Sequence, residues 1–335
     1  MSKISNVIHI AATALLASAS IASADPIKIR AAYIVPASNI ASILFSKKEL
    51  APHFGKSYVF EPVRYQGTPA MVTAMAVNEI EIGLLNFTSL GLGVVNAGMN
   101  DLRIVADEFR DGVPGRLSNE FFVRKDSGIK TPADLKGKVI AVNLTGAAID
   151  LAMRVQLRKF GLEDKRDYSV IEAPFPTMKG LLASKKADLV ATGAPFSLDQ
   201  ELRDMANPLF TEGDALGPNE LGFWVMRDEF AKKNKAAVVD LLEDTLRATR
   251  WYLDPKNHDE AVKLAADFAK APPALFQSWL FTEKDYYRDP NLEPDIAGTQ
   301  RTVDFAHDFG FIKQSFDVKQ YADLSYLHEA VARLK

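Results

Sequence analysis

Short apolar stretches alternate with amphipathic stretches along this chain of 335 residues, and this alternation constrains the fold most strongly. Strands of a parallel sheet that are separated by helices produce such a pattern. In the first third of the chain, the expected strands are 27–35, 58–65, 80–86 and 102–107, and the expected helices are 40–50, 69–78 and 89–97. The pattern therefore predicts an α/β fold, in which mostly parallel sheets are flanked by helices.

Two irregular segments interrupt the alternation. The first, 108–118, is polar and contains glycine and proline, and the second, 207–223, is rich in glycine. Between them we expect strands at 119–123, 139–142, 168–172 and 189–192 and helices at 147–160 and 178–184. Beyond them the chain is expected to be almost wholly helical, at 236–253, 258–270, 295–309 and 321–335.

This arrangement predicts that the middle block is inserted between two halves of the first lobe. A chain of this length exceeds what one compact core usually accommodates, so two lobes are expected. The boundaries place the first part of lobe 1 at 25–112, the inserted lobe 2 at 113–215 and the second part of lobe 1 at 216–335, which ends in a helical extension. Two crossings between the lobes would form a hinge with a cleft beside it.

The N-terminal residues have the layout of a secretory signal peptide. Lys3 precedes an apolar run at 7–19, and an Ala-Ser-Ala sequence that ends at Ala24 stands before Asp25. We expect cleavage after Ala24 and export. The chain contains no cysteine, so a lipoprotein anchor at the leader and a disulfide framework are both excluded. An exported protein without an anchor is expected in the periplasm.

Composition and motifs argue against most other classes. The net charge of −3 and the lack of a basic stripe do not favour nucleic acid as a partner. No thiol nucleophile is available, and no H-E-x-x-H, G-x-S-x-G or phosphate-loop motif occurs. The glycines of 91–98 have the wrong spacing for a dinucleotide loop. We therefore expect no catalytic residue, no metal site and no cofactor.

The junctions between strands and helices carry the polar residues that could bind a ligand. They are rich in small or hydroxyl residues and lie at 36–39, 66–68, 86–89, 143–146, 176–177 and 192–196. In a parallel sheet these junctions share the carboxyl edge, where ligands bind. Free N–H groups at helix N-termini suit an anionic group. Helix capping explains any single junction, but six junctions in two lobes predict one shared cleft.

Several sequence blocks resemble a known family. They are Gln66-Gly67-Thr68, 77–83, Asn119 to Val123, 129–142, and 185–189 leading to Ala194-Pro195. Together and in this order they resemble the periplasmic solute-binding proteins of nitrate/sulfonate/taurine-type ABC importers. The resemblance implies a type II periplasmic binding fold, a ligand enclosed by hinge closure, and a permease with its ATPase as partners. A monomer is expected.

The resemblance and the junctions together define the candidate ligand-binding residues. They are Ser38, Asn39, Gln66, Gly67, Thr68, Asn86, Phe87, Thr88, Ser89, Glu120, Asn143, Thr145, Gly146, Ala147, Thr192, Gly193 and Phe196. Taurine- and sulfonate-type relatives carry a tryptophan near the proline of the last block, whereas this chain has Thr192-Gly193-Ala194-Pro195, which predicts a roomier pocket. The junctions contain no Lys or Arg, and Arg64, Arg116 and Glu120 are either ligand contacts or surface and hinge charges.

The expected function is capture of a small organic solute for import. An anion such as a sulfonate, taurine, nitrate or a carboxylate is the first expectation. The alternatives are a pyrimidine-type vitamin precursor, a sensory binding protein that reports to a membrane receptor, and an enzyme similar to thiamin-pyrimidine synthases. The last of these would need a cysteine-rich motif that this chain lacks.

Overall fold

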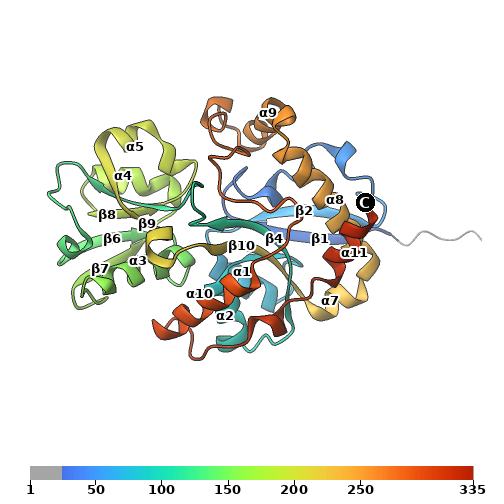
Figure 1. Cartoon of the computed structure of the whole chain (residues 1–335), viewed down its shortest axis with the longest axis horizontal. Coiled ribbons are helices and arrows are strands. Elements are labelled where there is room, and N and C mark those ends of the chain that lie inside the picture. The colour runs from blue at the N-terminus through green and yellow to red at the C-terminus, as the bar shows by residue number, and fades with distance from the viewer. Residues whose placement is uncertain (1–24, 335) are drawn as a thin grey trace, which may run out of the picture.

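The computed structural model describes residues 25–334, so the predicted leader at 1–24 lies outside the described part of the chain. Figure 1 shows two lobes joined by extended segments that include β4 and β10. The chain is an α/β protein in which sheets are flanked by helices, as the sequence predicts. The exact lobe boundaries at 112/113 and 215/216 remain a prediction.

Lobe 1 contains two small sheets. β1 (Ile27–Tyr33) pairs in parallel with β2 (Tyr58–Arg64), and an isolated bridge joins Ala31 to Ile82. The second sheet has the order β3 (Gly83–Leu85), β10 (Asn219–Arg227), β4 (Leu102–Asp111), and both of its pairings are antiparallel. The helices of this lobe are α1 (Thr68–Ala76), α2 (Phe87–Gly91), α7 (Asp228–Lys233), α8 (Lys235–Leu253), α9 (His258–Ala269), α10 (Ile296–Asp308) and α11 (Ser325–Arg333).

Lobe 2 is built on one five-stranded sheet. Its order is β7 (Tyr168–Glu172), β6 (Lys138–Val142), β8 (Leu189–Thr192), β5 (Glu120–Arg124), β9 (Ala206–Thr211). β6 is parallel to β7 and β8, whereas β5 is antiparallel to both of its neighbours. The helices are α3 (Ala148–Lys159), α4 (Met178–Ala183), α5 (Gln200–Met205) and α6 (Glu212–Leu216).

The expectation of mostly parallel sheets holds only in part. A parallel neighbour requires a crossover helix between the two strands. β5 and β10 instead enter their sheets directly from the segments that cross between the lobes, so they are antiparallel to their neighbours. The antiparallel pairings thus follow from the insertion of lobe 2 into lobe 1.

Two segments that local pattern assigned to linkers are strands. β4 continues to Asp111 inside the expected 108–118 linker, and the expected irregular stretch 207–223 contains most of β9, α6 and the start of β10. Asp111 and Asn219 are paired residues of the β4–β10 ladder. Partners far away in the sequence create these strands, and therefore their local composition does not reveal them.

The expected helix at 40–50 is also wrong, because only two short 3₁₀ turns form there, at Ile40–Ser42 and Lys48–Leu50. The backbone hydrogen bonds of this segment join residues three apart: the N–H of Ile43 donates to the carbonyl oxygen of Ile40 at 3.0 Å, and the N–H of Leu50 donates to that of Lys47 at 3.1 Å. The carboxylate of Glu108 accepts from the N–H of Ile40 at 2.9 Å and so caps the first turn. Smaller differences occur elsewhere: α2 begins at Phe87 and continues as a π-helical turn at Leu92–Asn96, and α11 begins at Ser325.

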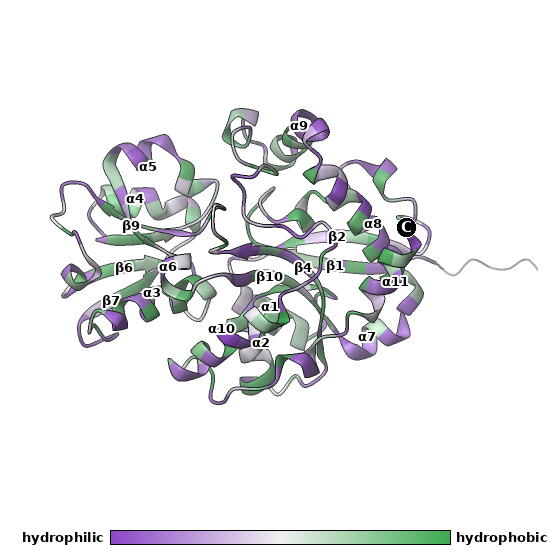
Figure 2. Ribbon diagram, in the orientation of Figure 1, coloured by the Kyte–Doolittle hydropathy of each residue, from purple (hydrophilic) through white to green (hydrophobic). Residues whose placement is uncertain are grey.

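The cores follow the alternation of side chains along strands. In β5, Phe121 stacks on Phe210 at 4.3 Å on one face of the sheet. Its neighbour Phe122 points to the opposite face and packs with Met178, Leu182 and Leu202 of α4 and α5. Figure 2 shows β6 as hydrophobic and the outer parts of α5 and α9 as hydrophilic.

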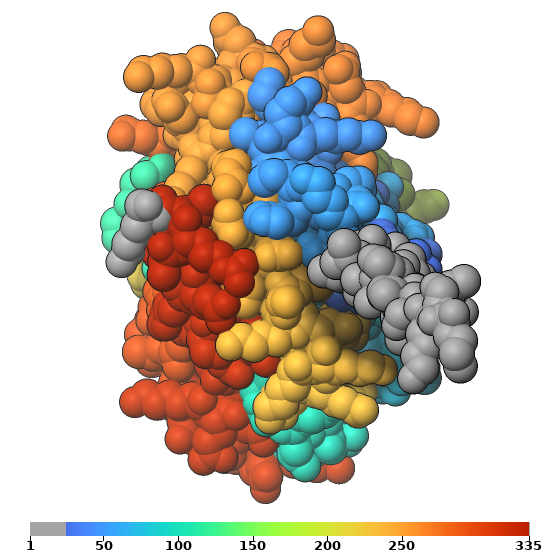
Figure 3. Space-filling view, turned by 90° about the vertical axis from the view of Figure 1, so that its right-hand side faces the viewer, coloured from blue at the N-terminus to red at the C-terminus, as the bar shows by residue number. Residues whose placement is uncertain are grey.

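On the side of lobe 1 away from lobe 2, α11 packs against α8, and Figure 3 shows these two helices side by side, α11 in red and α8 in yellow. Among the described residues, no helix is both long enough and apolar enough to span a bilayer.

The two crossing segments touch each other backbone to backbone. Gly112 has a φ of +68°, and a Cβ at this position would lie 2.7 Å from the carbonyl oxygen of Gly217 and 2.9 Å from Cα of Gly213. A side chain at position 112 would therefore push the crossings apart. A third segment lies beside them, because Tyr287 forms an isolated antiparallel bridge with Arg110 of β4.

Candidate functional site

A cavity of about 80 Å³ lies between the two lobes, and we call it the interlobe cavity. Lobe 1 and the C-terminal segment contribute Ile34, Val35, Ser38, Asn39, Thr68, Leu84, Asn86, Phe109, Leu221 and Tyr286 to its lining. Asn119, Asn143, Ala147, Ala148, Ile149, Phe175, Gly193 and Ala194 line it from the side of lobe 2.

The strand-to-helix junctions meet at this cavity. Five of the six predicted junctions contribute at least one lining residue, and the sixth, 176–177, contributes its neighbour Phe175. Of the predicted site residues, those that line the cavity are Ser38, Asn39, Thr68, Asn86, Asn143, Ala147 and Gly193.

The other predicted site residues lie elsewhere. Phe87, Thr88 and Ser89 are buried inside α2, and Thr192 is buried in β8. Gln66 and Phe196 line a hollow of about 290 Å³ together with Arg64, and this hollow adjoins the interlobe cavity because Ile34, Val35 and Phe175 line both. Thr145 and Gly146 line a hollow of about 630 Å³ beside α3. Gly67 lies at the contact between the lobes, where a Cβ would lie 3.2 Å from the side chain of Leu144.

Helix N-termini from both lobes point to the cavity. α1 begins at Thr68 and α3 begins at Ala148, and both residues line the cavity. Their N-cap residues, Gly67 and Ala147, have no side chain that could accept a hydrogen bond from the first turn. The N–H groups of Thr68 and Ala70 in α1, where Pro69 has none, and those of Ala148 and Ile149 in α3 are therefore available to an acceptor, and the helix dipoles favour negative charge there.

Two buried polar atoms in the cavity wall make no hydrogen bond within the described part of the protein. The hydroxyl of Thr68 and the side-chain oxygen of Asn143 are buried and make no hydrogen bond, although their residues are only 4% and 3% exposed. A buried polar group without a partner is costly, so a bound ligand that supplies one gains affinity. Asn86 differs, because its side-chain oxygen already caps α2 by accepting from the N–H of Ser89 at 3.0 Å.

Hydrogen bonds cross directly from one lobe to the other beside the cavity. The hydroxyl of Ser38 donates to the carbonyl oxygen of Ala194 at 3.1 Å. The side-chain amide of Gln66 donates to the carbonyl oxygen of Asn143 at 3.1 Å. The lobes are therefore closed on each other in this structure.

A buried charge cluster holds the loop after β1 in place. Glu108 accepts from the N–H of Ile40 at 2.9 Å and from the indole of Trp224 at 2.7 Å. Arg288 donates to the carbonyl oxygen of Ser38 at 2.6 Å and pairs with Asp285 at 3.2 Å. Burial raises the pKa of Glu108, while these donors oppose the shift.

Two more buried carboxyls lie behind the cavity wall at the hinge. The side-chain amide of Asn119 donates to Glu212 at 2.9 Å, and the backbone N–H of Asn119 donates to Asp111 at 2.8 Å. Burial raises the pKa of Asp111 to about 7. Burial and the nearby Asp111 raise the pKa of Glu212 well above its usual range. This pair therefore retains a proton when the surrounding solution is near neutral.

The cavity wall itself is uncharged. Every lining residue is apolar, an amide, a hydroxyl or a glycine. Of the charged candidates, Glu120 forms an ion pair with Arg203 at 2.5 Å, and Arg116 donates to the carbonyl oxygen of Thr282 at 3.2 Å. Arg64 lines the adjoining hollow of about 290 Å³ and not the interlobe cavity. An anion in the cavity would therefore be held by N–H and O–H groups.

The comparison with protein families decides the relationship. The model of a family described as NMT1-like matches residues 22–266. This chain belongs to the NMT1-like family. The two-lobed fold that surrounds the cavity is thus the fold of an NMT1-like protein.

Among curated proteins, this NMT1-like chain is similar to the nitrate/nitrite binding protein NrtA of Synechococcus elongatus. The two are 28% identical over 159 residues, which cover 45% of this chain and 36% of the relative. The match thus spans about a third of the length of that relative.

Solved structures share the fold across almost the whole chain. The periplasmic nitrate-binding protein NrtA from Synechocystis PCC 6803 has a TM-score of 0.74 at 15% identity, with 92% of this chain and 89% of that chain covered. The alkanesulfonate-binding protein SsuA from Xanthomonas axonopodis pv. citri, bound to MOPS, has a TM-score of 0.71 at 21% identity, with 90% and 99% covered. The desulfurization enzyme DSZB has a TM-score of 0.65 at 16% identity, with 92% and 100% covered. The fold therefore occurs in both binding proteins and an enzyme.

Sequence reasoning missed several lining residues of this NMT1-like protein. Phe109 and Leu221 lie in the strand segments that had been assigned to linkers, and Asn119 directly follows the first crossing. Aromatic residues are dense at 276–287, and of these Phe276 and Trp279 are buried in the core. Tyr286 from the same segment lines the cavity instead. The density of aromatic residues there was the one signal that could have found it.

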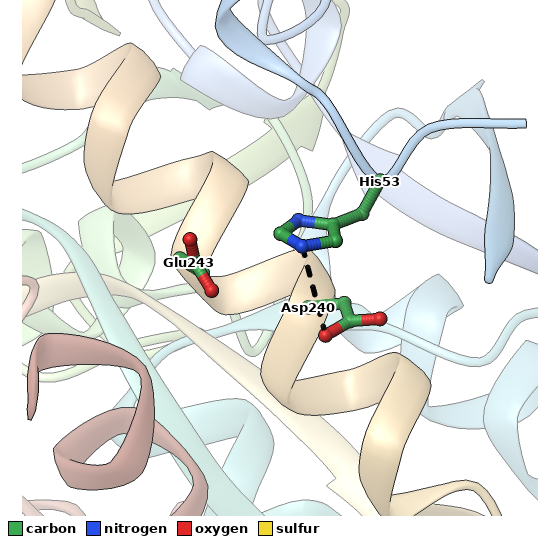
Figure 4. A group of neighbouring side chains, drawn as sticks. All are labelled: His53, Asp240 and Glu243. Carbon is green, nitrogen blue, oxygen red and sulfur yellow. Dashed lines mark ion pairs between the residues drawn. The ribbon is translucent and has the colours of Figure 1, made fainter. Parts of the chain in front are cut away.

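A cluster of His53, Asp240 and Glu243 lies away from the cavity, and Figure 4 shows these three side chains pointing toward one another. Cations already compensate its carboxylates. Arg333 lies 2.8 Å from Asp240, and Arg247 lies 2.9 Å from Glu243. The cluster is therefore an ion-pair network on the outer face of α8, and it fits a metal ion poorly.

Proposed function

We propose that this protein is the periplasmic solute-binding component of an ABC importer and that it encloses a small organic solute between its two lobes. One observation carries the proposal: a cavity lies between the lobes, and its wall contains unpartnered polar atoms from both of them. Thr68 belongs to lobe 1 and Asn143 to lobe 2. A ligand that bonds to both would stabilise the closed arrangement.

An anionic group is our first choice of ligand chemistry. The first turns of α1 and α3 supply free N–H groups from opposite lobes, and the Thr68 hydroxyl lies beside one of them. Helix N-termini bind anions without the help of Lys or Arg. The names of the similar nitrate- and sulfonate-binding proteins agree with this choice. The ligand class proposed is a sulfonate, taurine, nitrate or carboxylate.

The remaining wall favours an organic body attached to that group. Leu84, Phe109, Phe175 and Leu221 present apolar surface to the cavity. Nitrate would leave this surface without a partner. The same surface also supports the second candidate, a pyrimidine-type heteroaromatic solute, whose ring would contact the apolar wall and whose ring nitrogens would bond to the amides.

A catalytic role is the less favoured proposal, although the similar DSZB is an enzyme. DSZB was also crystallised with biphenyl-2-sulfinic acid after one of its cysteines had been replaced by serine, whereas this chain contains no cysteine. The cavity wall also contains no ionisable side chain except the Tyr286 hydroxyl, so it offers no carboxylate, imidazole or amine for proton transfer.

Export with cleavage after Ala24, a permease and its ATPase as partners, and a monomeric state are parts of the same proposal. Native mass spectrometry of freshly purified protein tests the central claim by detecting a retained ligand. A thermal-shift panel of nitrate, taurine, alkanesulfonates, aromatic carboxylates and pyrimidines then assigns its class. A ligand at a hundredfold excess over its Kd stabilises the protein by about 2.7 kcal/mol. A panel without any shift, together with no retained ligand, would refute the proposal.

A further inference from the structure

Tyr286 comes from a C-terminal segment that is anchored on lobe 1 and reaches toward lobe 2. The next residue, Tyr287, accepts a hydrogen bond at its carbonyl oxygen from the N–H of Arg110 at 2.9 Å. Two residues beyond Tyr286, the buried Arg288 donates to the carbonyl oxygen of Ser38. These contacts fix the backbone next to Tyr286 to β4 and to the loop after β1.

The hydroxyl of Tyr286 bonds to two groups of the other lobe. It donates to the side-chain oxygen of Asn119 at 2.7 Å, and it accepts from the N–H of Ala194 at 3.3 Å. Asn119 stands just before β5, and Ala194 follows β8. One phenol thus connects the C-terminal segment to two points of lobe 2, and each of these three residues also lines the interlobe cavity.

The residue opposite the phenol leaves room for this contact. A Cβ at position 193 would lie 2.2 Å from the side-chain oxygen of Asn119 and 2.6 Å from the Tyr286 hydroxyl. Only glycine allows the backbone of lobe 2 to approach so closely. The ring of Tyr286 packs at 5.3 Å from Phe109 and so completes the apolar wall.

The phenol remains a hydrogen-bond donor over the physiological pH range. Burial, followed by the negative charge of Asp111, raises the pKa of Tyr286 well above its usual value. Deprotonation therefore does not interrupt the bond to Asn119.

We propose that Tyr286 is a positioning residue that fastens the two lobes in their closed arrangement, through hydrogen bonds from its hydroxyl to Asn119 and Ala194. The inference rests on the proposed function, in which closure encloses the ligand. Since the same ring forms part of the cavity wall, a ligand that packs against Tyr286 also stabilises the closed arrangement. Closure and occupancy are then coupled through one side chain.

The absence of cysteine from the chain allows a direct test by electron–electron distance measurement. Lys186→Cys in lobe 2 and Lys256→Cys in lobe 1 place spin labels at two exposed sites. The distance distribution is recorded in the full mature chain without an added ligand and with MOPS, taurine or nitrate. Tyr286→Phe removes only the hydroxyl. Tyr287→Phe is the matched control, because its hydroxyl contacts Asp289 of the same segment at 3.4 Å.

We expect the ratio of closed to open molecules to fall about fivefold to tenfold in Tyr286→Phe, because the hydrogen bonds of the hydroxyl to Asn119 and Ala194 are lost. Tyr287→Phe should match the wild type. Gly193→Ala, which displaces the phenol without changing it, should shift the distribution in the same direction as Tyr286→Phe. Circular dichroism of each variant checks that it is folded.

Equal distributions in Tyr286→Phe and the wild type would overturn the inference, and so would a wild type without any closed component. The proposed function is judged separately, on the wild type alone. It fails if the thermal-shift panel gives no shift and native mass spectrometry finds no retained ligand, whatever the phenylalanine variant does.

Discussion

The hydroxyl of Ser38 lies 3.1 Å from the carbonyl oxygen of Ala194, and this hydrogen bond joins the loop after β1 to the loop after β8. Both residues line the interlobe cavity, and both are buried. The contact between the lobes and the binding surface therefore share residues. A ligand in this cavity acts on the same groups that hold the lobes together, so a substitution in the wall changes affinity and closure together.

Substitution of Thr68 and of Thr145 tests whether the ligand binds in the interlobe cavity, because only Thr68 lines it. Thr68→Ala removes a buried, unpartnered hydroxyl from the cavity wall. We expect it to weaken binding of the ligand identified by native mass spectrometry by about 1 kcal/mol, the usual net value of one hydrogen bond. Thr145→Ala changes an exposed residue outside the cavity and should leave the affinity unchanged. Titration calorimetry measures both, and a larger loss in Thr145→Ala would exclude the interlobe cavity as the site.

Glycine at the crossing of the lobes tests the backbone contact there. Gly112→Ala introduces a Cβ against the carbonyl oxygen of Gly217 at a residue with positive φ. Gly115→Ala is the control, because Gly115 has a similar φ of +79° and a Cβ there would meet no atom within 4 Å. The control should lose about 1–2 kcal/mol from the left-handed conformation alone. Gly112→Ala should lose clearly more in urea denaturation, and equal losses would mean that the crossings can separate without cost.

Stability should fall as the pH rises from about 4 to about 7. Burial raises the folded-state pKa of Asp111 to about 7 and that of Glu212 well above its usual range, whereas the unfolded carboxyls titrate near 4. In this interval the folded state binds more protons than the unfolded state, so each such carboxyl lowers the free energy of unfolding by up to about 1.4 kcal/mol per pH unit. The buried Asp107, Glu108 and Glu220 shift in the same direction.

Glu212→Gln removes one of these titratable carboxyls and so tests its contribution to the pH dependence of stability. The glutamine side chain can still accept from Asn119 through its oxygen, and its amide takes the position of an oxygen that has no partner. We expect a shallower fall in stability between pH 4 and 7 in urea titrations at several pH values. Glu283→Gln, at an exposed glutamate, should retain the wild-type slope. Identical slopes in both variants would show that Glu212 is ionised in the folded protein.

The cluster at His53 should not respond to metal. Arg333 and Arg247 already neutralise Asp240 and Glu243, so a divalent cation would have to displace them. Zinc added to chelator-treated protein is expected to leave the thermal midpoint unchanged. A midpoint that rises with zinc and falls again with chelator would contradict this interpretation of the ion pairs.

Local pattern was sufficient for much of the fold because several elements are defined by residues close in the sequence. The long helices α8 and α9 begin and end within a few residues of their predicted bounds. Their periodic apolar faces extend over several turns and leave little ambiguity.

The predictions failed where distant residues decide. β10 forms because β3 and β4 pair with its two edges, and the residues next to β10 in the sequence do not predict this pairing. The segment around Asn39 is held by distant residues, since Glu108 accepts from the N–H of Ile40 and Arg288 donates to the carbonyl oxygen of Ser38. At the site, Thr68, Asn86 and Asn143 followed from the rule that strand ends meet at one edge. Asn119 and Tyr286 did not, because crossing segments bring them to the cavity.

By itself, the sequence determined the α/β class, the interrupted order of two lobes and the junctions that face the cleft, because hydrophobic periodicity and helix capping act over short distances. Only the tertiary structure decided that Thr145 lies outside the cavity, that Phe196 lines the adjoining hollow and that the cavity wall is uncharged. It alone placed the Tyr286 hydroxyl against Asn119 and Ala194. The physical reason is that closure of the lobes joins segments far apart in the sequence, 92 residues in the case of Ala194 and Tyr286, and their contacts depend on packing that no local pattern encodes.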